Sequence, residues 1–99
     1  MAEVTVIYWR DIPAQVLVRA GRAAAKRVLA PRFQQAIDAA AMGAGAQDGE
    51  AYLAEWRRSV AGQADGELEL LADDAARRLE ADYDAERLRR LVAAGGREP

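Results

Sequence analysis

The apolar and polar positions of the first twenty residues predict two β-strands joined by a tight turn. Residues 3–10 read EVTVIYWR, a run of β-branched and aromatic residues of the kind that favours strands. Residues 11–13, DIP, interrupt the run, and residues 15–19, QVLVR, resume it. Because aspartate and proline both favour turns, we predict a β-hairpin with its turn near residues 11–13.

From residue 22 onward the apolar residues recur every three or four positions, which predicts helices. Pro31 interrupts this pattern, and proline is tolerated in the first turn of a helix but not in its interior. We therefore predict a short helix over residues 22–29 and a main helix that begins near Pro31. The glycines in residues 42–45, MGAG, mark the end of that helix.

Three further helices are predicted in the second half of the chain. Asp48 and Asp84 are suitable N-cap residues for two of them, and residues 59–66, SVAGQADG, have the composition of a loop. The helices are expected over residues 49–58, 67–82 and 85–94.

These elements predict an α+β fold in which an N-terminal β-hairpin packs against four or five α-helices. A chain of 99 residues is too short for two ordinary domains, so we expect a single domain over residues 1–96 and a disordered tail over residues 97–99. Only six residues are aromatic, so the core must be thin. A second chain that covers part of its surface would stabilise such a domain.

The composition excludes several kinds of chemistry. The chain has no cysteine and no histidine, so it has no disulfide framework, no thiol nucleophile, no thiolate or imidazole metal ligand, and no imidazole general base. We expect no catalytic residue set. The start of the chain lacks the basic and apolar pattern of a signal peptide, and no apolar run is long enough to span a bilayer, so we expect a cytoplasmic protein without a membrane partner.

Charge is unevenly distributed along the chain. The net charge is −2, but residues 1–40 carry six basic and three acidic residues, a sum of +3, while residues 41–99 carry eight basic and thirteen acidic residues, a sum of −5. The acidic total disfavours nucleic acid as a partner. The basic half of the chain is where we expect an anionic partner to bind.

Residues 8–11, YWRD, are the least generic stretch of the sequence. Because Tyr8 and Trp9 are adjacent, they point to opposite faces of a strand, so one can enter the core while the other meets a partner. Arg10 and Asp11 fall at the predicted hairpin tip, where a guanidinium can bind a carboxylate or phosphate and an aspartate can cap a turn. We predict that these four residues bind a partner. The alternative is that they only shape the turn and anchor the core.

Two other groups are candidates for partner binding. Arg19, Arg22, Lys26 and Arg27 form a basic strip if the predicted strand and helix are correct; the alternative is a solvated helix face, since no glycine-rich phosphate loop accompanies them. Residues 55–58, EWRR, place an aromatic beside arginines, as interface hot spots often do. Trp56 and Arg57 are therefore candidates, with a core tryptophan beside solvated arginines as the alternative.

The acidic residues of the second half do not predict a metal site. Between residues 73 and 90 they alternate with arginines at helical spacing, which is typical of an exposed, ion-paired helix face. No calcium-loop spacing is present. The glycines of residues 43–45 follow a predicted helix rather than a strand, so they do not form a nucleotide motif. We expect neither a metal nor a cofactor.

Four segments resemble a family of small bacterial proteins known as the "virulence factor, conserved region" family. They are VTVIYWRDIPAQV at residues 4–16, AKRVLAPRFQQAIDAAAM at 25–42, AYLAEWRR at 51–58, and LEADYD with RLRRLVAAGG between 79 and 96. The family name describes a phenotype of larger members, in which a similar segment is joined to a helical-repeat region, and it implies no reaction and no catalytic residues. Free-standing members accompany folate- and corrinoid-dependent one-carbon enzymes. The resemblance thus implies an accessory protein or small subunit of a methyl-transfer or methylenetetrahydrofolate-reducing system.

Two functions from different classes remain open at this point. The first is a non-catalytic interaction domain that docks on a larger enzyme, with a homodimer as the variant in which the partner is a second copy. The second is a protein that binds a small anionic, folate-like molecule, or acts on it, through Arg10 and Asp11. The thin core, the segregated charge and the lack of histidine and cysteine favour the first.

Overall fold

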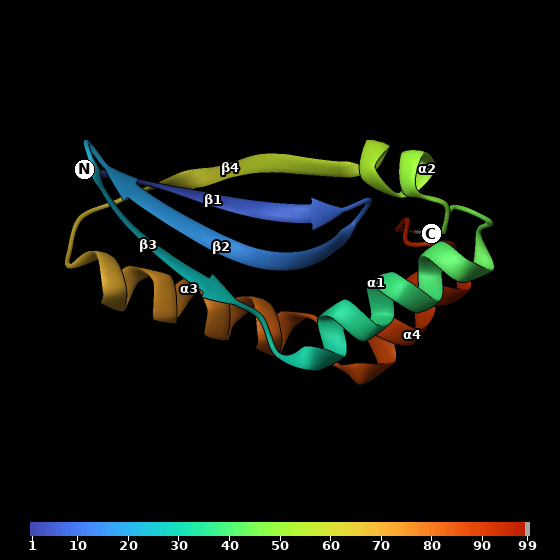
Figure 1. Cartoon of the computed structure of the whole chain (residues 1–99). Coiled ribbons are helices and arrows are strands. Elements are labelled where there is room, and N and C mark those ends of the chain that lie inside the picture. Colours follow the sequence, from blue (N-terminus) through green and yellow to red (C-terminus); the bar gives the residue numbers. More distant parts are fainter. Residues whose placement is uncertain (99) are drawn as a thin grey trace.

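Four strands and four helices make up the computed structural model, which describes residues 1–98 (Figure 1). The strands are β1 (Ala2–Trp9), β2 (Ile12–Ala20), β3 (Ala23–Val28) and β4 (Trp56–Ala64). The helices are α1 (Pro31–Gly43), α2 (Gly49–Ala54), α3 (Leu68–Asp82) and α4 (Ala85–Ala93).

The strands form one antiparallel sheet in the order β3-β2-β1-β4. Two tight turns join the first three strands: Arg10 and Asp11 link β1 to β2, and Gly21 and Arg22 link β2 to β3. Gly21 has a φ of +60°, a conformation that glycine adopts without steric cost. The chain then passes through α1 and α2 before β4 returns to pair with β1.

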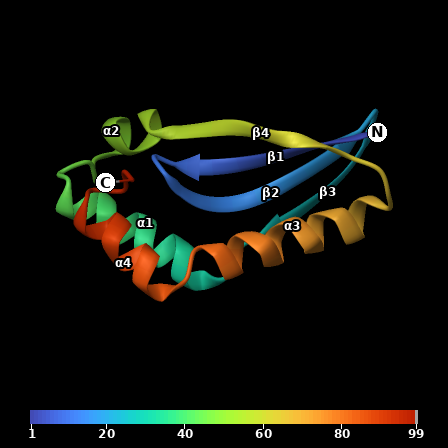
Figure 2. The ribbon, with the colours of Figure 1, turned by 180° about the vertical axis from the view of Figure 1, so that it is seen from behind.

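Three of the helices, α1, α3 and α4, lie on one side of the sheet, and α2 lies at the end of β4 (Figures 1 and 2). α3 runs beneath the strands and packs chiefly on β2 and β3, while α1 and α4 pack on each other near the hairpin tip (Figures 1 and 2). The core lies between these layers, where Val16 and Val18 of β2 are fully buried together with Phe33, Ile37 and Leu91. The protein is thus a small, single α+β domain. Within residues 1–98 the second face of the sheet has a helix only at one end, where Tyr52 of α2 contacts Trp56.

Several predicted elements are confirmed. The N-terminal hairpin is present, α1 begins at Pro31, and α3 and α4 match the predicted helices to within one residue at each end. Asp48 and Asp84 are N-caps, and their side chains accept hydrogen bonds from the N–H groups of Ala51 (3.0 Å) and Arg87 (2.8 Å).

Three predicted elements are wrong in whole or in part. Residues 22–29 are not helical: they contain the turn residue Arg22 and the strand β3, because the edge of β2 offers backbone hydrogen bonds that outweigh the helix propensity of three alanines. The predicted helix over 49–58 ends at Ala54, and most of the predicted loop over 59–66 belongs to β4, which pairs along the whole of β1. The sheet therefore has four strands rather than two.

The predicted disordered tail at residues 97–99 stays a prediction. The Glu98 N–H donates to the Asp11 carboxylate at 2.7 Å, and the Arg97 guanidinium lies 3.3 Å from the Glu55 carboxylate. Residue 99 lies outside the described residues.

Candidate functional site

Trp9 is the anchor of the hairpin tip. Its side chain is completely buried, its indole Nε1 donates to the Tyr52 carbonyl at 2.9 Å, and its ring stacks on the Tyr52 ring with 5.8 Å between centroids. The α-carbon of Gly96 approaches so closely that a Cβ there would lie 2.9 Å from Trp9 Cζ3. Trp9 therefore joins β1 to α2 and to the C-terminal residues, and of the two adjacent aromatics Tyr8 is the more exposed.

Arg10 uses its hydrogen-bond donors within the molecule. Nη1 donates to the Gly95 carbonyl at 2.7 Å, Nη2 lies 3.4 Å from the Glu55 carboxylate, and the guanidinium lies 4.9 Å from the centre of the Trp9 ring. The backbone N–H donates to the Glu55 carbonyl at 3.1 Å. Only Nε lacks a hydrogen-bond partner within residues 1–98. Arg10 thus connects the β1–β2 turn to Glu55 and to Gly95, which are far from it in the sequence.

Asp11 and Arg57 complete this group of contacts. Arg57 Nη2 donates to the Asp11 carboxylate at 3.1 Å, Arg57 Nε donates to the Arg10 carbonyl at 2.9 Å, and the guanidinium lies 4.4 Å from the centre of the Tyr8 ring. The two most distinctive motifs, YWRD and EWRR, are therefore brought together. These contacts favour the alternative in which the tetrad shapes the turn and anchors the core; partner binding by Tyr8, Trp9, Arg10, Asp11 and Arg57 stays a prediction.

The predicted basic strip is divided between the two faces of the sheet. Arg27 points toward α3, where it donates to Asp73 and Glu69 at 2.6 Å each, and the hydrogen bond to Asp73, followed by that to Glu69, raises the pKa of its guanidinium above its usual value. Lys26 lies opposite Leu17, and Arg19 opposite Ala24, on the side away from α3. The strip was predicted on a helix that does not form, so its four members do not share one surface.

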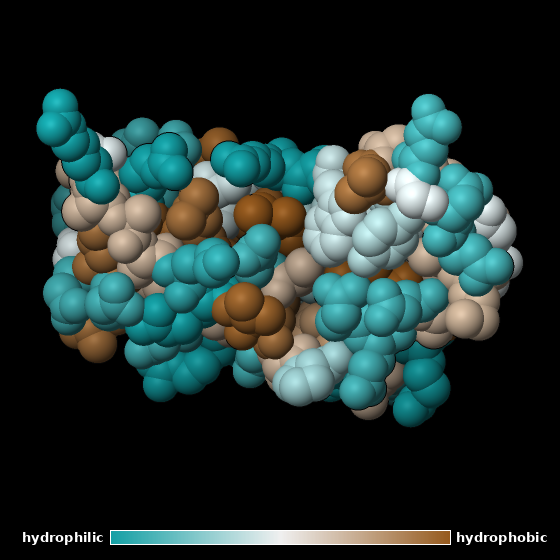
Figure 3. Space-filling view, viewed as in Figure 1, coloured by the Kyte–Doolittle hydropathy of each residue, from teal (hydrophilic) through white to brown (hydrophobic). Residues whose placement is uncertain are grey.

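The side of the sheet that faces away from α3, which we call the open face, gathers the remaining candidates. Aliphatic side chains predominate at its centre: the strand register places Leu17 and Val60 on either side of Thr5, and Ile7 lies on the same face beside Gln15. Val28 and Val60 are 70% and 60% exposed. Figure 3 shows brown apolar patches between teal hydrophilic ones on the side of the molecule that is seen in Figure 1.

Cations surround this aliphatic centre. Arg19, Lys26 and Arg58 have no ion-pair partner among the described residues, and the nearest acidic residue in the strand register is Glu3. Trp56 stands at one end of the face, half-buried, with its ring edge-on to Tyr52 at 5.8 Å. Two hollows of about 390 and 140 Å3 flank the Arg58 side chain, one beside Trp56 and the other beside Arg19.

Sequence reasoning found only part of the open face. Arg19, Lys26 and Trp56 were candidates and lie on it, and Arg22 lies in the turn at its edge. The residues that were missed are Ile7, Leu17, Val28, Arg58 and Val60. Arg58 and Val60 had little signal in the sequence, because Arg57 interrupts the alternation of large and small side chains and the glycine and polar residues that follow favour a loop.

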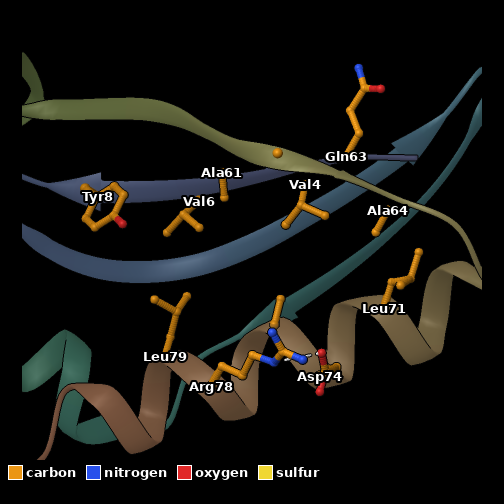
Figure 4. Close-up of a pocket in the computed structure, with 12 residues that line it drawn as sticks. Val4, Val6, Tyr8, Ala61, Gln63, Ala64, Leu71, Asp74, Arg78 and Leu79 are labelled. Carbon is orange, nitrogen blue, oxygen red and sulfur yellow. Dashed lines mark ion pairs between the residues drawn. The ribbon is translucent and has the colours of Figure 1, made fainter. Parts of the chain in front are cut away.

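A second surface lies between α3 and the strands β1 and β4 (Figure 4). It is an apolar groove of about 330 Å3, which we call the α3–β4 groove. Val4, Val6 and Tyr8 hang from β1 toward Leu71 and Leu79 of α3, and an ion pair between Asp74 and Arg78 (3.0 Å) lies at its rim.

Neither surface presents a recognisable metal site. Within residues 1–98, no three or more acidic side chains converge in a way that would hold a metal ion. A separate observation concerns the helices: none in this part of the chain is both long and apolar enough to cross a membrane.

Comparison with known proteins gives one match. A family model described as "Virulence factor" matches residues 7–92, a span that includes both YWRD and EWRR. No curated protein and no solved structure matches the chain.

Proposed function

Because the chain belongs to the virulence factor family, whose name specifies no reaction, we propose that it is a non-catalytic interaction domain that docks through its open face on an acidic surface of a larger protein. The observation that carries this proposal is a partly exposed aliphatic centre surrounded by three cations that have no ion-pair partner within residues 1–98. Interfaces between proteins commonly combine an apolar centre with a polar rim. Trp56 and Arg58 are residue types that often dominate binding energy at such interfaces.

Charge selects the kind of partner. The protein as a whole is acidic, with a net charge of −2, but the open face carries Arg19, Lys26 and Arg58 against Glu3. A partner surface rich in aspartate and glutamate would gain favourable contacts there and would be steered toward this face rather than the helical one.

The composition of the face favours a protein over a nucleic acid. Sheets that bind single-stranded RNA or DNA stack the bases on aromatic side chains near the sheet centre. Here the centre is formed by Ile7, Leu17 and Val60, and Trp56 lies at the end of the sheet. An apolar, non-aromatic centre is better suited to a protein side-chain layer.

The first partners to test are folate- and corrinoid-dependent one-carbon enzymes, the class with which the family resemblance associates free-standing members. In this proposal the domain acts as a small subunit or accessory protein of such an enzyme. The competing small-molecule hypothesis requires Arg10 to bind an anionic ligand. It has less support, because both terminal nitrogens of Arg10 already contact Gly95 and Glu55.

The experiment compares affinity purification of three tagged forms of the full chain from the native host. The wild type is set beside Arg19→Glu/Arg58→Glu, which reverses two open-face charges, and Arg77→Glu/Arg89→Glu, which makes the same charge change at two exposed arginines on α3 and α4. We expect a stoichiometric, acidic partner that the wild type and the helix variant retain and the open-face variant loses. Its yield from the wild type should fall as salt is raised.

Two results would contradict the proposal. One is a wild-type protein that is recovered without a stoichiometric partner. The other is a partner that binds the open-face variant as well as it binds the helix variant.

A further inference from the structure

The smaller hollow of the open face, of about 140 Å3, lies between two arginines. Arg19 of β2 is paired with Glu3, and Arg58 of β4 is paired with Ile7, so the two arginines flank β1 on either side of Thr5. Long side chains in a sheet reach their diagonal neighbours. Both arginines and Thr5 therefore line the same hollow.

Thr5 is a buried polar residue at this place. It is only 8% exposed, and none of the side-chain hydrogen bonds within residues 1–98 involves its hydroxyl. A buried hydroxyl that makes no hydrogen bond costs free energy. The hydroxyl can donate one hydrogen bond to a group that enters the hollow.

The two guanidiniums also have donors to offer. Neither Arg19 nor Arg58 forms a side-chain hydrogen bond or an ion pair within residues 1–98. By contrast, Arg27 and Arg57 bind carboxylates of the same chain. Glu3 is the one acidic residue in the lining of the hollow, and it lies in no ion pair with either arginine.

We propose that Arg19, Arg58 and Thr5 form a binding site for one carboxylate group, which in the docked complex belongs to an aspartate or glutamate side chain of the partner. The inference rests on the proposed function, because it names the group that the open face binds. Guanidiniums donate paired hydrogen bonds to carboxylate oxygens, and the hydroxyl adds a further donor.

The charge of the hollow selects a carboxylate over a phosphate group. Its lining carries two positive charges, on Arg19 and Arg58, and one negative charge, on Glu3. One carboxylate neutralises the positive charge that remains. A phosphate monoester, with a charge of about −2, would leave an excess negative charge beside Glu3.

The test uses acetate as the probe and NMR of the full chain as the measurement, at constant ionic strength. We expect the Nε–Hε signals of Arg19 and Arg58 and the amide signal of Thr5 to shift with a single dissociation constant. Arg19→Gln and Arg58→Gln should each weaken acetate binding about tenfold, because each removes a charged donor. Thr5→Val should weaken it roughly fivefold. The matched control is Arg77→Gln, at an exposed arginine of α3, which should leave the constant unchanged.

Glu3→Gln should change binding in the opposite direction. It removes the negative charge of the lining and should tighten acetate binding about threefold. A variant that binds acetate no better than the wild type would contradict the assigned charge balance.

Several results would overturn the carboxylate site. They are signals of Arg19, Arg58 and Thr5 that do not shift, signals that shift with different constants, and inorganic phosphate that binds these residues more tightly than acetate does. The titration needs no partner, so its outcome is separate from that of the affinity purification. A partner that depends on the open face, together with no acetate binding, would refute only the carboxylate site. Acetate binding without a recovered partner would keep the carboxylate site and contradict only the docking.

Discussion

Arg10 combines a strained backbone with unusually many contacts. Its φ is +53°, a conformation that costs a non-glycine residue of the order of 1 kcal/mol or more. The compensation comes from its hydrogen bonds to Gly95 and Glu55 and from the Trp9 ring. Strain of this kind persists where surrounding contacts fix the residue. The hairpin tip is therefore the place where β1 contacts both Glu55, just before β4, and Gly95, which follows α4.

Substitution of Gly96 tests the contacts at the hairpin tip. Gly96 has a φ of +91°, and a Cβ there would lie 2.9 Å from Trp9 Cζ3. Gly96→Ala should therefore lower the free energy of unfolding by about 2 kcal/mol in urea denaturation, because backbone strain and the clash add. The control is Gly43→Ala at the end of α1, where no atom lies within 4 Å of the new Cβ. That variant should be neutral or more stable by about 0.5 kcal/mol, and equal effects of the two substitutions would refute the argument.

Tyr83 gives a prediction for alkaline pH. Burial, with a smaller contribution from the nearby Tyr8, raises the pKa of Tyr83 to about 12 from its ordinary value of 10.0. The unfolded state then loses the proton more readily than the folded state. The contribution of Tyr83 to the free energy of unfolding is therefore fully present below pH 10 and falls as pH rises toward 12. Denaturation at pH 9 and pH 11 should differ by about 1 kcal/mol from this residue.

Tyr83→Phe is the matched variant, because it removes the titrating hydroxyl and keeps the ring that packs against Phe33. The pH 9 to pH 11 loss should shrink by the same amount. An unchanged loss would assign the alkaline sensitivity to other groups.

At the scale of elements, what the sequence predicted correctly follows from local rules. Pro31 and the caps Asp48 and Asp84 act within one turn of helix, and they placed the starts of α1, α2 and α4 correctly. β3 is different. Ala25 and Leu29 are buried while Lys26 and Val28 are exposed, so burial alternates with the period of two that is typical of a strand. The three consecutive alanines at residues 23–25 hide this alternation in the sequence. Its conformation depends on the free edge of β2, which lies outside the local sequence.

The contacts of the candidate site likewise depend on residues far apart in the sequence. YWRD and EWRR were recognisable as unusual, but their mutual contacts depend on β4 pairing with β1, so sequence alone suggested an exposed tip where the structure has an internal junction. Once β4 is known to be a strand, positions 56, 58 and 60 fall on one face. The open face could therefore be predicted once residues 56–64 are known to form the strand β4.

The cap of α4 is the prediction at this scale. The Asp84 side chain accepts from the Arg87 N–H at 2.8 Å, and the helix it starts buries Leu88 and Leu91. Asp84→Ala should lower the free energy of unfolding by about 1 kcal/mol. Asp84→Asn retains the acceptor oxygen and should keep most of that stability in the same denaturation experiment. If the two variants were equally destabilised, charge rather than capping would be the cause.

At the scale of the whole molecule, the open face and the α3–β4 groove lie on opposite sides of one thin sheet. The molecule measures 40 × 28 × 21 Å along its principal axes, so it is elongated along the strands. Its Cα radius of gyration is 13.9 Å, close to the value of about 13 Å expected for a compact chain of this length.

The distribution of charge predicts that the isolated protein is a monomer. If two copies paired through their open faces, Arg19, Lys26 and Arg58 of each would approach the same cations of the other, with only Glu3 to offset them. This repulsion is strongest at low salt, where screening is weak.

Sedimentation and small-angle X-ray scattering at low salt should therefore give the mass of one chain and a radius of gyration near that of the single molecule. A stable dimer under those conditions would contradict this prediction. A monomer at low salt that associates only when salt is raised would show that the same charges oppose self-association and leave the open face available for an acidic surface.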